Sequence, residues 1–195
     1  MKWRVLTLAV LTVLLAGGVV TVGSQKACAH VFNCADFVTG GGFWEPRFEG
    51  GPPNRVNVGF NAGSRNGDPA DIKGHFNLVD HNDGTHIDGV NVDTYVVCFG
   101  GDPNCRRFEG DAKVNGTPGF RYAVNVCDYG EPGRDGGTPN PGNDRIRVTV
   151  TGPGFSYFAD NFSSGKTCPP GAPNCGDLDG GNFQLHKTCP TCPEG

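Results

Sequence analysis

The sequence predicts an all-β protein: an antiparallel meander of about eight to nine strands that forms a flattened barrel or β-sandwich and is stapled by disulfides. Three observations predict it. Apolar residues alternate with polar ones along most of the chain, which is the period of a strand with one buried face. Gly and Pro account for 32 and 15 of the 195 residues, and they gather in turn clusters without a collagen-like repeat. The nine cysteines suit a cross-linked, exported fold.

The alternating runs are bounded by Gly, Pro, Asn and Asp, which end strands and favour turns. The predicted strands are Phe37–Trp44, Arg55–Ala62, Ile72–His81, His86–Phe99, Arg106–Val114, Gly119–Cys127, Asp144–Thr151, Ser156–Phe162 and Gly181–His186. The pattern of apolar residues at i, i+3, i+4 and i+7 is nowhere long enough to predict a core helix. Successive strands joined by short loops favour a meander.

Similar glycine-rich segments lie near the two ends of this series of strands. They are Gly40-Gly41-Gly42-Phe43 and Gly180-Gly181-Asn182-Phe183. We expect the first and last strands to pair, which would close the sheet and remove its exposed edges. The longest loop, from Gly130 to Asn143, has no apolar anchor. It is predicted to be a mobile surface loop, with a binding loop as the alternative.

The N-terminus has the features of a secretory signal peptide. Lys2 and Arg4 precede an apolar run that is interrupted by glycines and is marginal for a membrane span. Cleavage is expected after Ser24, or after Ala29 at an Ala-x-Ala site that would release His30. The chain is therefore predicted to be secreted, with no membrane partner after cleavage.

These features predict three segments along the chain. They are a signal peptide over 1–29, a single all-β domain over 30–186 and a Cys/Pro-rich tail over 187–195. After cleavage at the second site the chain keeps 13 of its 16 basic residues against 20 acidic ones, a net charge of −7. An acidic surface repels phosphate backbones, so nucleic acid is excluded as a partner. An extracellular protein or a glycan is the expected partner.

Cleavage after Ala29 would also remove Cys28 and leave an even number of cysteines, as a disulfide framework prefers. The eight predicted disulfide cysteines are Cys34, Cys98, Cys105, Cys127, Cys168, Cys175, Cys189 and Cys192. Cys98 with Cys105, and Cys168 with Cys175, each flank a short loop that a disulfide could close. The Lys-Thr-Cys-Pro segment occurs twice, which suggests the alternative that Cys168 and Cys175 pair with Cys189 and Cys192. The disulfide connectivity therefore stays open.

Five segments carry a family resemblance. They are Val38–Gly42, Val58–Ala62, Gly74–His81, Val124–Gly133 and Gly180–His186. In this order, over nearly the whole mature chain, they resemble the post-COAP-1 family of exported bacterial proteins. The resemblance implies an all-β secreted module, found alone or appended to other surface domains. Because the family has no established activity, the resemblance implies no catalytic residue.

The Asp83-Gly84 dipeptide points to a metal site. Asp-Gly suits a two-residue type I′ turn, which would set His81 directly opposite His86. His81, His86 and Asp88 would then share one face, as ligands suited to zinc, copper or iron. The alternative is a solvated hairpin end without a ligand.

Three further arrangements suggest bound ions. The oxygens of Asp80–Asp83 could hold calcium, although they do not fit the EF-hand spacing. A mature N-terminal His30 could chelate copper through its amine and ring, the arrangement used by copper-dependent polysaccharide oxidases. His186, Cys189 and Cys192 would form a zinc set if the thiols stayed reduced, but exported thiols usually oxidise.

Signatures of hydrolases are missing from the sequence. It has no Gly-x-Ser-x-Gly elbow, and none of its five glutamates lies in an acid/base motif. Phe43 and Trp44 could form a sugar-stacking platform, although a core role is the commoner one for such rings. We therefore predict a secreted, non-catalytic structural or binding module of the bacterial surface or exterior, with no cofactor. The alternative is a copper- or zinc-dependent extracellular enzyme or a carbohydrate-binding domain.

Overall fold

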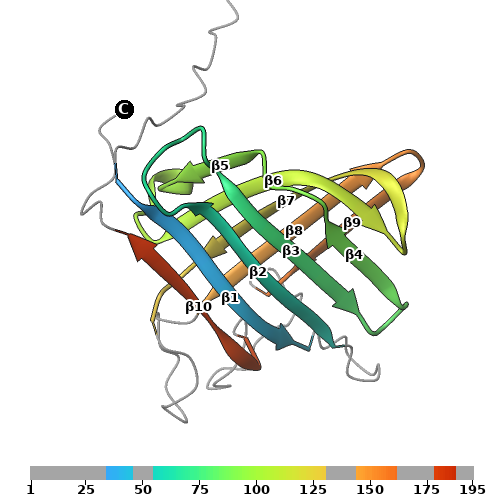
Figure 1. Cartoon of the computed structure of the whole chain (residues 1–195). Helices are drawn as coiled ribbons and strands as arrows, with labels where there is room; N and C mark the ends of the chain where they lie inside the picture. The colour runs from blue at the N-terminus through green and yellow to red at the C-terminus, as the bar shows by residue number, and fades with distance from the viewer. Residues whose placement is uncertain (1–33, 46–54, 131–143, 162–177, 188–195) are drawn as a thin grey trace, which may run out of the picture.

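The computed structural model describes residues 34–45, 55–130, 144–161 and 178–187, which form one antiparallel sheet (Figure 1). Its strands are β1 (Asp36–Trp44), β2 (Val56–Ser64), β3 (Lys73–Asp80), β4 (Thr85–Gly89), β5 (Thr94–Val97), β6 (Cys105–Val114), β7 (Thr117–Cys127), β8 (Arg145–Gly152), β9 (Phe155–Asp160) and β10 (Gly180–Lys187). Within these residues the one helical segment is η1, a 3-10 turn at Phe99–Gly101. The predicted all-β antiparallel fold is confirmed. No helix in the described part of the chain is long and apolar enough to cross a membrane.

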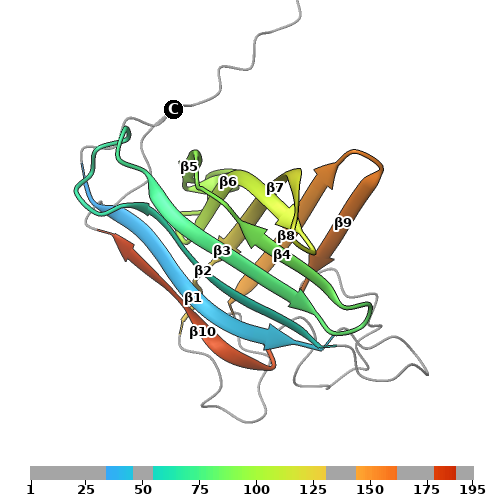
Figure 2. The same ribbon diagram turned by 45° about the vertical axis from the view of Figure 1, so that its right-hand side comes forward.

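The sheet curls into a half-barrel. Its strand order is β10-β1-β2-β3-β4-β6-β7-β8-β9, with β5 paired to β6 off this path. The strands from β10 to β4 form the front of the molecule, and β6 to β9 pass behind them (Figures 1 and 2). The predicted pairing of the first and last strands is confirmed. It does not close the ladder, however, because β10 and β9 are the two ends of the path.

The two glycine-rich segments lie side by side in the β1–β10 pair. Gly40 pairs with Phe183, and a Cβ on Gly40 would lie 2.5 Å from the Phe183 ring and 2.7 Å from the Phe60 ring. Gly181 has a φ of 108°, and a Cβ there would lie 2.2 Å from the Gly41 carbonyl oxygen. Glycine is thus required where the strands approach closely and where core rings cross the backbone.

The predicted continuous strand His86–Phe99 is wrong, because the segment divides into β4 and β5. Ile87 on β4 and Tyr95 on β5 have the same buried phase, but Val92 between the strands is also buried, so the alternation is interrupted there. The Asn91 carbonyl oxygen crosses β6 at Gly110, where a Cβ would lie 2.0 Å from it. These inserted residues let β4 and β5 pair with separate parts of β6.

Aromatic rings fill the core between the front and the back of the curl. Neighbouring ring centroids lie 4.9 to 6.3 Å apart. The rings belong to Phe60, Phe76, Phe108, Tyr122 and Phe183, and all are buried. Because each ring removes a large apolar area from water, the cluster holds β2, β3 and β10 against β6 and β7.

Candidate functional site

The β3–β4 hairpin differs from the prediction. Asp80 pairs with Thr85, so the loop contains four residues, His81–Gly84. The Asp80 carbonyl accepts the Gly84 N–H at 3.0 Å, and the Asp80 carboxylate accepts the Asn82 N–H at 2.9 Å. These bonds stabilise a wider turn, and the predicted two-residue Asp-Gly turn is wrong.

This register separates His81 from the other two predicted metal ligands, His86 and Asp88. His86 Nε2 lies 2.8 Å from Asn77 Nδ2 and 3.3 Å from Asp88 Oδ1. His81 lies in the loop instead, with Nε2 3.0 Å from Asn57 Nδ2. The expected opposition of His81 and His86 is therefore wrong. Among the described residues, no three His, Cys, Asp or Glu side chains form a group that could hold a metal ion.

The carboxylates of the predicted calcium segment have partners within the protein. Asp80 Oδ2 accepts the Tyr157 hydroxyl at 2.9 Å, which joins the end of β3 to β9. Asp83 Oδ1 accepts the Thr85 N–H at 2.8 Å. Burial, followed by the negative charge of Asp80, raises the pKa of Tyr157. These contacts give both carboxylates a structural role.

The aromatic residues singled out in the sequence have different positions. Trp44 is 3% exposed and lies in the core, so it has the core role predicted as the commoner one for such rings, and the sugar-stacking alternative does not hold for the tryptophan. The Arg55 guanidinium lies over the Phe43 ring, 3.7 Å from its centroid. His186 stacks on Phe37 with 4.5 Å between ring centroids.

Many of the predicted site residues lie outside the described residues. They are the signal peptide, His30, loop residues 131–143, and Cys168, Cys175, Cys189 and Cys192. Within the described part Cys34 and Cys98 are disulfide-bonded, and Cys105 is joined to Cys127 with an S–S distance of 2.09 Å. A Cys98–Cys105 disulfide is therefore wrong. Cys105 lies directly opposite Cys127 on β6 and β7, with 4.1 Å between their Cα atoms.

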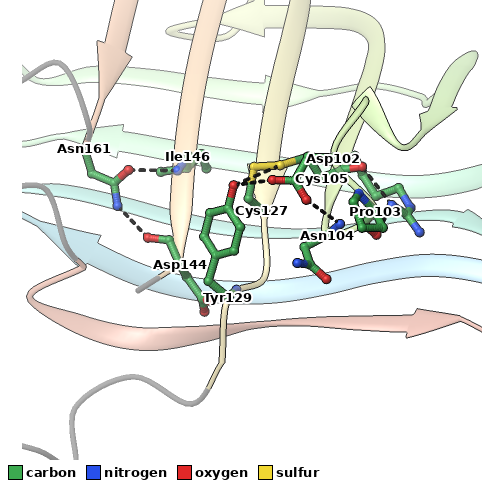
Figure 3. Close-up of a disulfide and its surroundings, with 10 residues drawn as sticks. Asp102, Pro103, Asn104, Cys105, Cys127, Tyr129, Asp144, Ile146 and Asn161 are labelled. Carbon is green, nitrogen blue, oxygen red and sulfur yellow. Dashed lines mark hydrogen bonds between the residues drawn. A yellow bond between two sulfur atoms is a disulfide. The ribbon is translucent and has the colours of Figure 1, made fainter. Parts of the chain in front are cut away.

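Polar groups surround this disulfide (Figure 3). The Tyr129 hydroxyl donates to Asp102 at 2.6 Å and lies 3.5 Å from Cys105 Sγ. Burial, followed by the hydrogen bond to Asp102, raises the pKa of Tyr129. Since both bonded cysteines are buried, the disulfide and its neighbours form a structural link at the end of the β6–β7 pair.

A charged pair is buried inside the curl. Asp36 on β1 is 1% exposed and Arg106 on β6 is 2% exposed. Arg106 donates from Nε and Nη2 to the two carboxylate oxygens at 2.7 and 2.6 Å. Its Nη1 donates to the carbonyls of Pro103 and Cys105. Tyr95 on β5 donates its hydroxyl to Asp36 at 2.7 Å. Burial and then the Asp36 charge raise the pKa of Tyr95. The pair thus has the additional hydrogen bonds that a buried ion pair needs.

Two carboxylates connect β10 to the back of the molecule. Asp144, just before β8, accepts the Phe183 N–H at 2.6 Å and the Tyr129 N–H at 3.1 Å. Asp128, just after β7, accepts the Leu185 N–H at 2.8 Å. Asp144 is 0% exposed. Side chains therefore bridge the two parts of the curl where no strand ladder continues.

The back of the molecule carries charged side chains on its outer face. Arg121 on β7 donates to Asp93, and to Asp111 at 3.3 Å. Its Nη2 also lies 3.9 Å from Glu109. The hydrogen bond from Arg121 holds the pKa of Asp93 below its usual value. Because these side chains are partly exposed, the pairs contribute little to stability.

Sequence reasoning missed both buried networks. The sequence did contain a signal that Arg106 is buried. Arg106 lies two positions before Phe108 in the predicted strand, so both side chains point to the same, buried face. Together the fold and these contacts define a disulfide-linked β half-barrel in which buried ionisable groups join strands. Comparison with family models, curated proteins and solved structures yields no match to this chain.

Proposed function

We propose that the protein is a secreted, non-catalytic structural or binding module of the bacterial surface or exterior. The observation that supports this proposal best is that the buried charged groups have their hydrogen-bonding partners within the protein. Asp36 uses both carboxylate oxygens to join Arg106 and Tyr95. A catalytic acid or base has to exchange a proton with its substrate. These groups are instead committed to holding β1, β5 and β6 together.

The sequence resemblance supports the same proposal. The motif segments Val38–Gly42, Val58–Ala62 and Gly180–His186 lie on β1, β2 and β10, which form the front edge of the sheet. A post-COAP-1-like module with a signal peptide over 1–29 and a set of disulfide cysteines fits export. Its partner would be an extracellular protein or a glycan.

The test is the intact mass of the exported protein, measured native and denatured, before and after reduction. We expect a chain that begins at His30 and gains two hydrogens for each disulfide on reduction. After incubation with zinc or copper and removal of excess ion, the native mass should show no bound metal. Free thiols before reduction would contradict a fully cross-linked module.

A metal-dependent enzyme is the competing function, favoured by the 3.3 Å between His86 Nε2 and Asp88 Oδ1. That function predicts one zinc or copper ion per chain, lost in His86→Ala. His75→Ala is the matched control, since His75 is an exposed histidine on neighbouring β3. Stoichiometric metal that disappears only in His86→Ala would overturn the proposed non-catalytic module.

A further inference from the structure

The front of the half-barrel carries two rows of uncharged residues on its outer face. β10, β1, β2 and β3 bury alternate residues, so the residues between them face outward. Strand pairing sets one row as Asn182, Gly41, Gly59 and Asn77. The next row is Gln184, Thr39, Asn61 and His75. The exposed polar groups are the amides of Asn61 and Gln184 and the imidazole of His75, beside the bare backbone of the two glycines. Asn77 donates to its pairing partner Asp88 on β4, and the side-chain oxygen of Asn182 is buried.

Two glycines lie directly opposite each other at the centre of this uncharged face. A Cβ on Gly59 would meet no atom within 4 Å, and a Cβ on Gly41 would meet its nearest atom, the Val58 carbonyl oxygen, at 3.5 Å. Neither glycine is therefore required by packing, unlike Gly40 on the buried side of β1. A glycine that packing does not require in a strand often marks a place where a ligand approaches the backbone closely.

The second row has hydrogen-bonding capacity that the described residues do not use. Asn61, His75 and Gln184 are exposed, and their side chains form no hydrogen bond within the described part of the chain. An amide side chain offers an acceptor and two donors in one plane. Because these groups stand on paired strands, their positions relative to one another are fixed before a ligand arrives.

Planar groups flank the rows at both ends of β1. His186 stacks on Phe37, and Thr39 Oγ1 lies 3.1 Å from His186 Nε2. At the other end the Arg55 guanidinium covers the Phe43 ring. Six residues of extended strand place the two rings about 20 Å apart. The uncharged face is thus elongated and suits a linear ligand.

We propose that this uncharged face binds a neutral polysaccharide, an inference that rests on the proposed function as a binding module and names its ligand class. Sugar hydroxyls both donate and accept hydrogen bonds, as side-chain amides do. An anionic polymer would require cations among the central groups, but the cations Arg55, Arg65 and Lys73 lie at the margins. The charged group beside the rows is the carboxylate of Asp88, next to Asn77, which would repel an anion. A protein partner would require an apolar interface centre, whereas this centre holds glycines and amides.

Affinity electrophoresis of the full exported protein tests the proposal. Native gels would contain a neutral β-glucan, xylan or mannan, or the anionic polymers alginate and heparin. We expect retardation by at least one neutral polysaccharide and by neither anionic one. Absence of retardation by every neutral polymer, or retardation by the anionic ones alone, would overturn the inference. If the mass measurement still shows a metal-free, fully cross-linked chain, the module itself stands and only its ligand class fails.

Variants locate the binding on the uncharged face. Gly59→Gln fills the open position, and we expect its dissociation constant to rise about tenfold. Thr149→Gln, on the outer face of β8, is the matched control and should bind as the unmodified protein does. Asn61→Ala removes an exposed amide without adding bulk and should also weaken binding. Unchanged circular dichroism and melting temperature would show that each variant is folded. Binding unaffected by both Gly59→Gln and Asn61→Ala would overturn the assignment to this face.

Discussion

Replacing Asp36 by alanine would leave the Arg106 guanidinium buried without its carboxylate partner. Removing one member of a buried ion pair costs about 3–5 kcal/mol, so Asp36→Ala should lower the free energy of unfolding by about that amount in guanidinium chloride denaturation. Asp93→Ala is the matched control, because it removes a partner of the half-exposed Arg121. It should cost about 1 kcal/mol or less. Equal losses in the two variants would contradict a structural role for the buried pair.

At the same scale, the sequence contained a signal for one member of this pair, Arg106, although sequence reasoning predicted neither member. Strand phase places Arg106 on the buried side with Phe108. The partner of Arg106 lies 70 residues away, and the contact exists because the sheet curls until β1 faces β6. Local spacing carries no information about that curvature. The hairpin error has a different, local cause, since the Asp80 side chain stabilises a wider turn than the Asp-Gly preference alone predicts.

Two glycines on β1 and β2 should respond in opposite ways to alanine because they face opposite sides of the sheet. A Cβ on Gly40 would lie 2.5 Å from the Phe183 ring, and overpacking of this kind costs about 1–3 kcal/mol. A Cβ on Gly59 meets nothing within 4 Å, and alanine there should stabilise the strand by about 0.5–1 kcal/mol. Thermal unfolding measures both changes. Destabilisation by Gly59→Ala as large as that by Gly40→Ala would contradict the outward position of Gly59.

The attachment of β10 makes a second prediction at the scale of strands. Asp144→Ala removes the acceptor of the Phe183 N–H, and an unsatisfied buried donor costs about 1–3 kcal/mol. Hydrogen exchange of peptides covering β10 should become faster than in the unmodified protein. Asp83→Ala also removes an acceptor of a backbone N–H, in the exposed β3–β4 loop, and should leave β10 exchange unchanged. Unaltered exchange of β10 in Asp144→Ala would mean that pairing with β1 alone holds the strand.

Alternation of apolar residues predicted most strands because nearly every strand has one buried face. It failed between β4 and β5, where Asn91 crosses β6 at Gly110 and the buried Val92 interrupts the alternation. The uncharged front face was also hidden from sequence reasoning. Its rows depend on the register of four strands, and residues from Thr39 to Gln184 meet in one of them.

Over the whole molecule, the phenols link distant parts of the curl. Each of the four tyrosines donates its hydroxyl to another part of the chain. Tyr95 bonds to Asp36, Tyr122 to the Asn91 carbonyl, Tyr129 to Asp102 and Tyr157 to Asp80. In each case burial is the first cause of a raised pKa, followed by a nearby carboxylate. The folded state therefore favours the neutral phenols.

This shared shift predicts how stability depends on alkaline pH. A tyrosine in the unfolded chain ionises near pH 10, and a folded-state pKa above that value favours the folded state while the phenol is neutral. The resulting stability is fully present below about pH 10 and is lost as the pH rises further, because the unfolded chain then releases protons that the folded chain retains. In the folded protein the phenolate absorbance of each tyrosine should rise at a higher pH than the value near pH 10 of the unfolded chain. All four should titrate near pH 10 in guanidinium chloride. A phenol ionising near pH 10 before unfolding would show that its hydroxyl is not held in the contact described, and the single Tyr→Phe variants would identify which one.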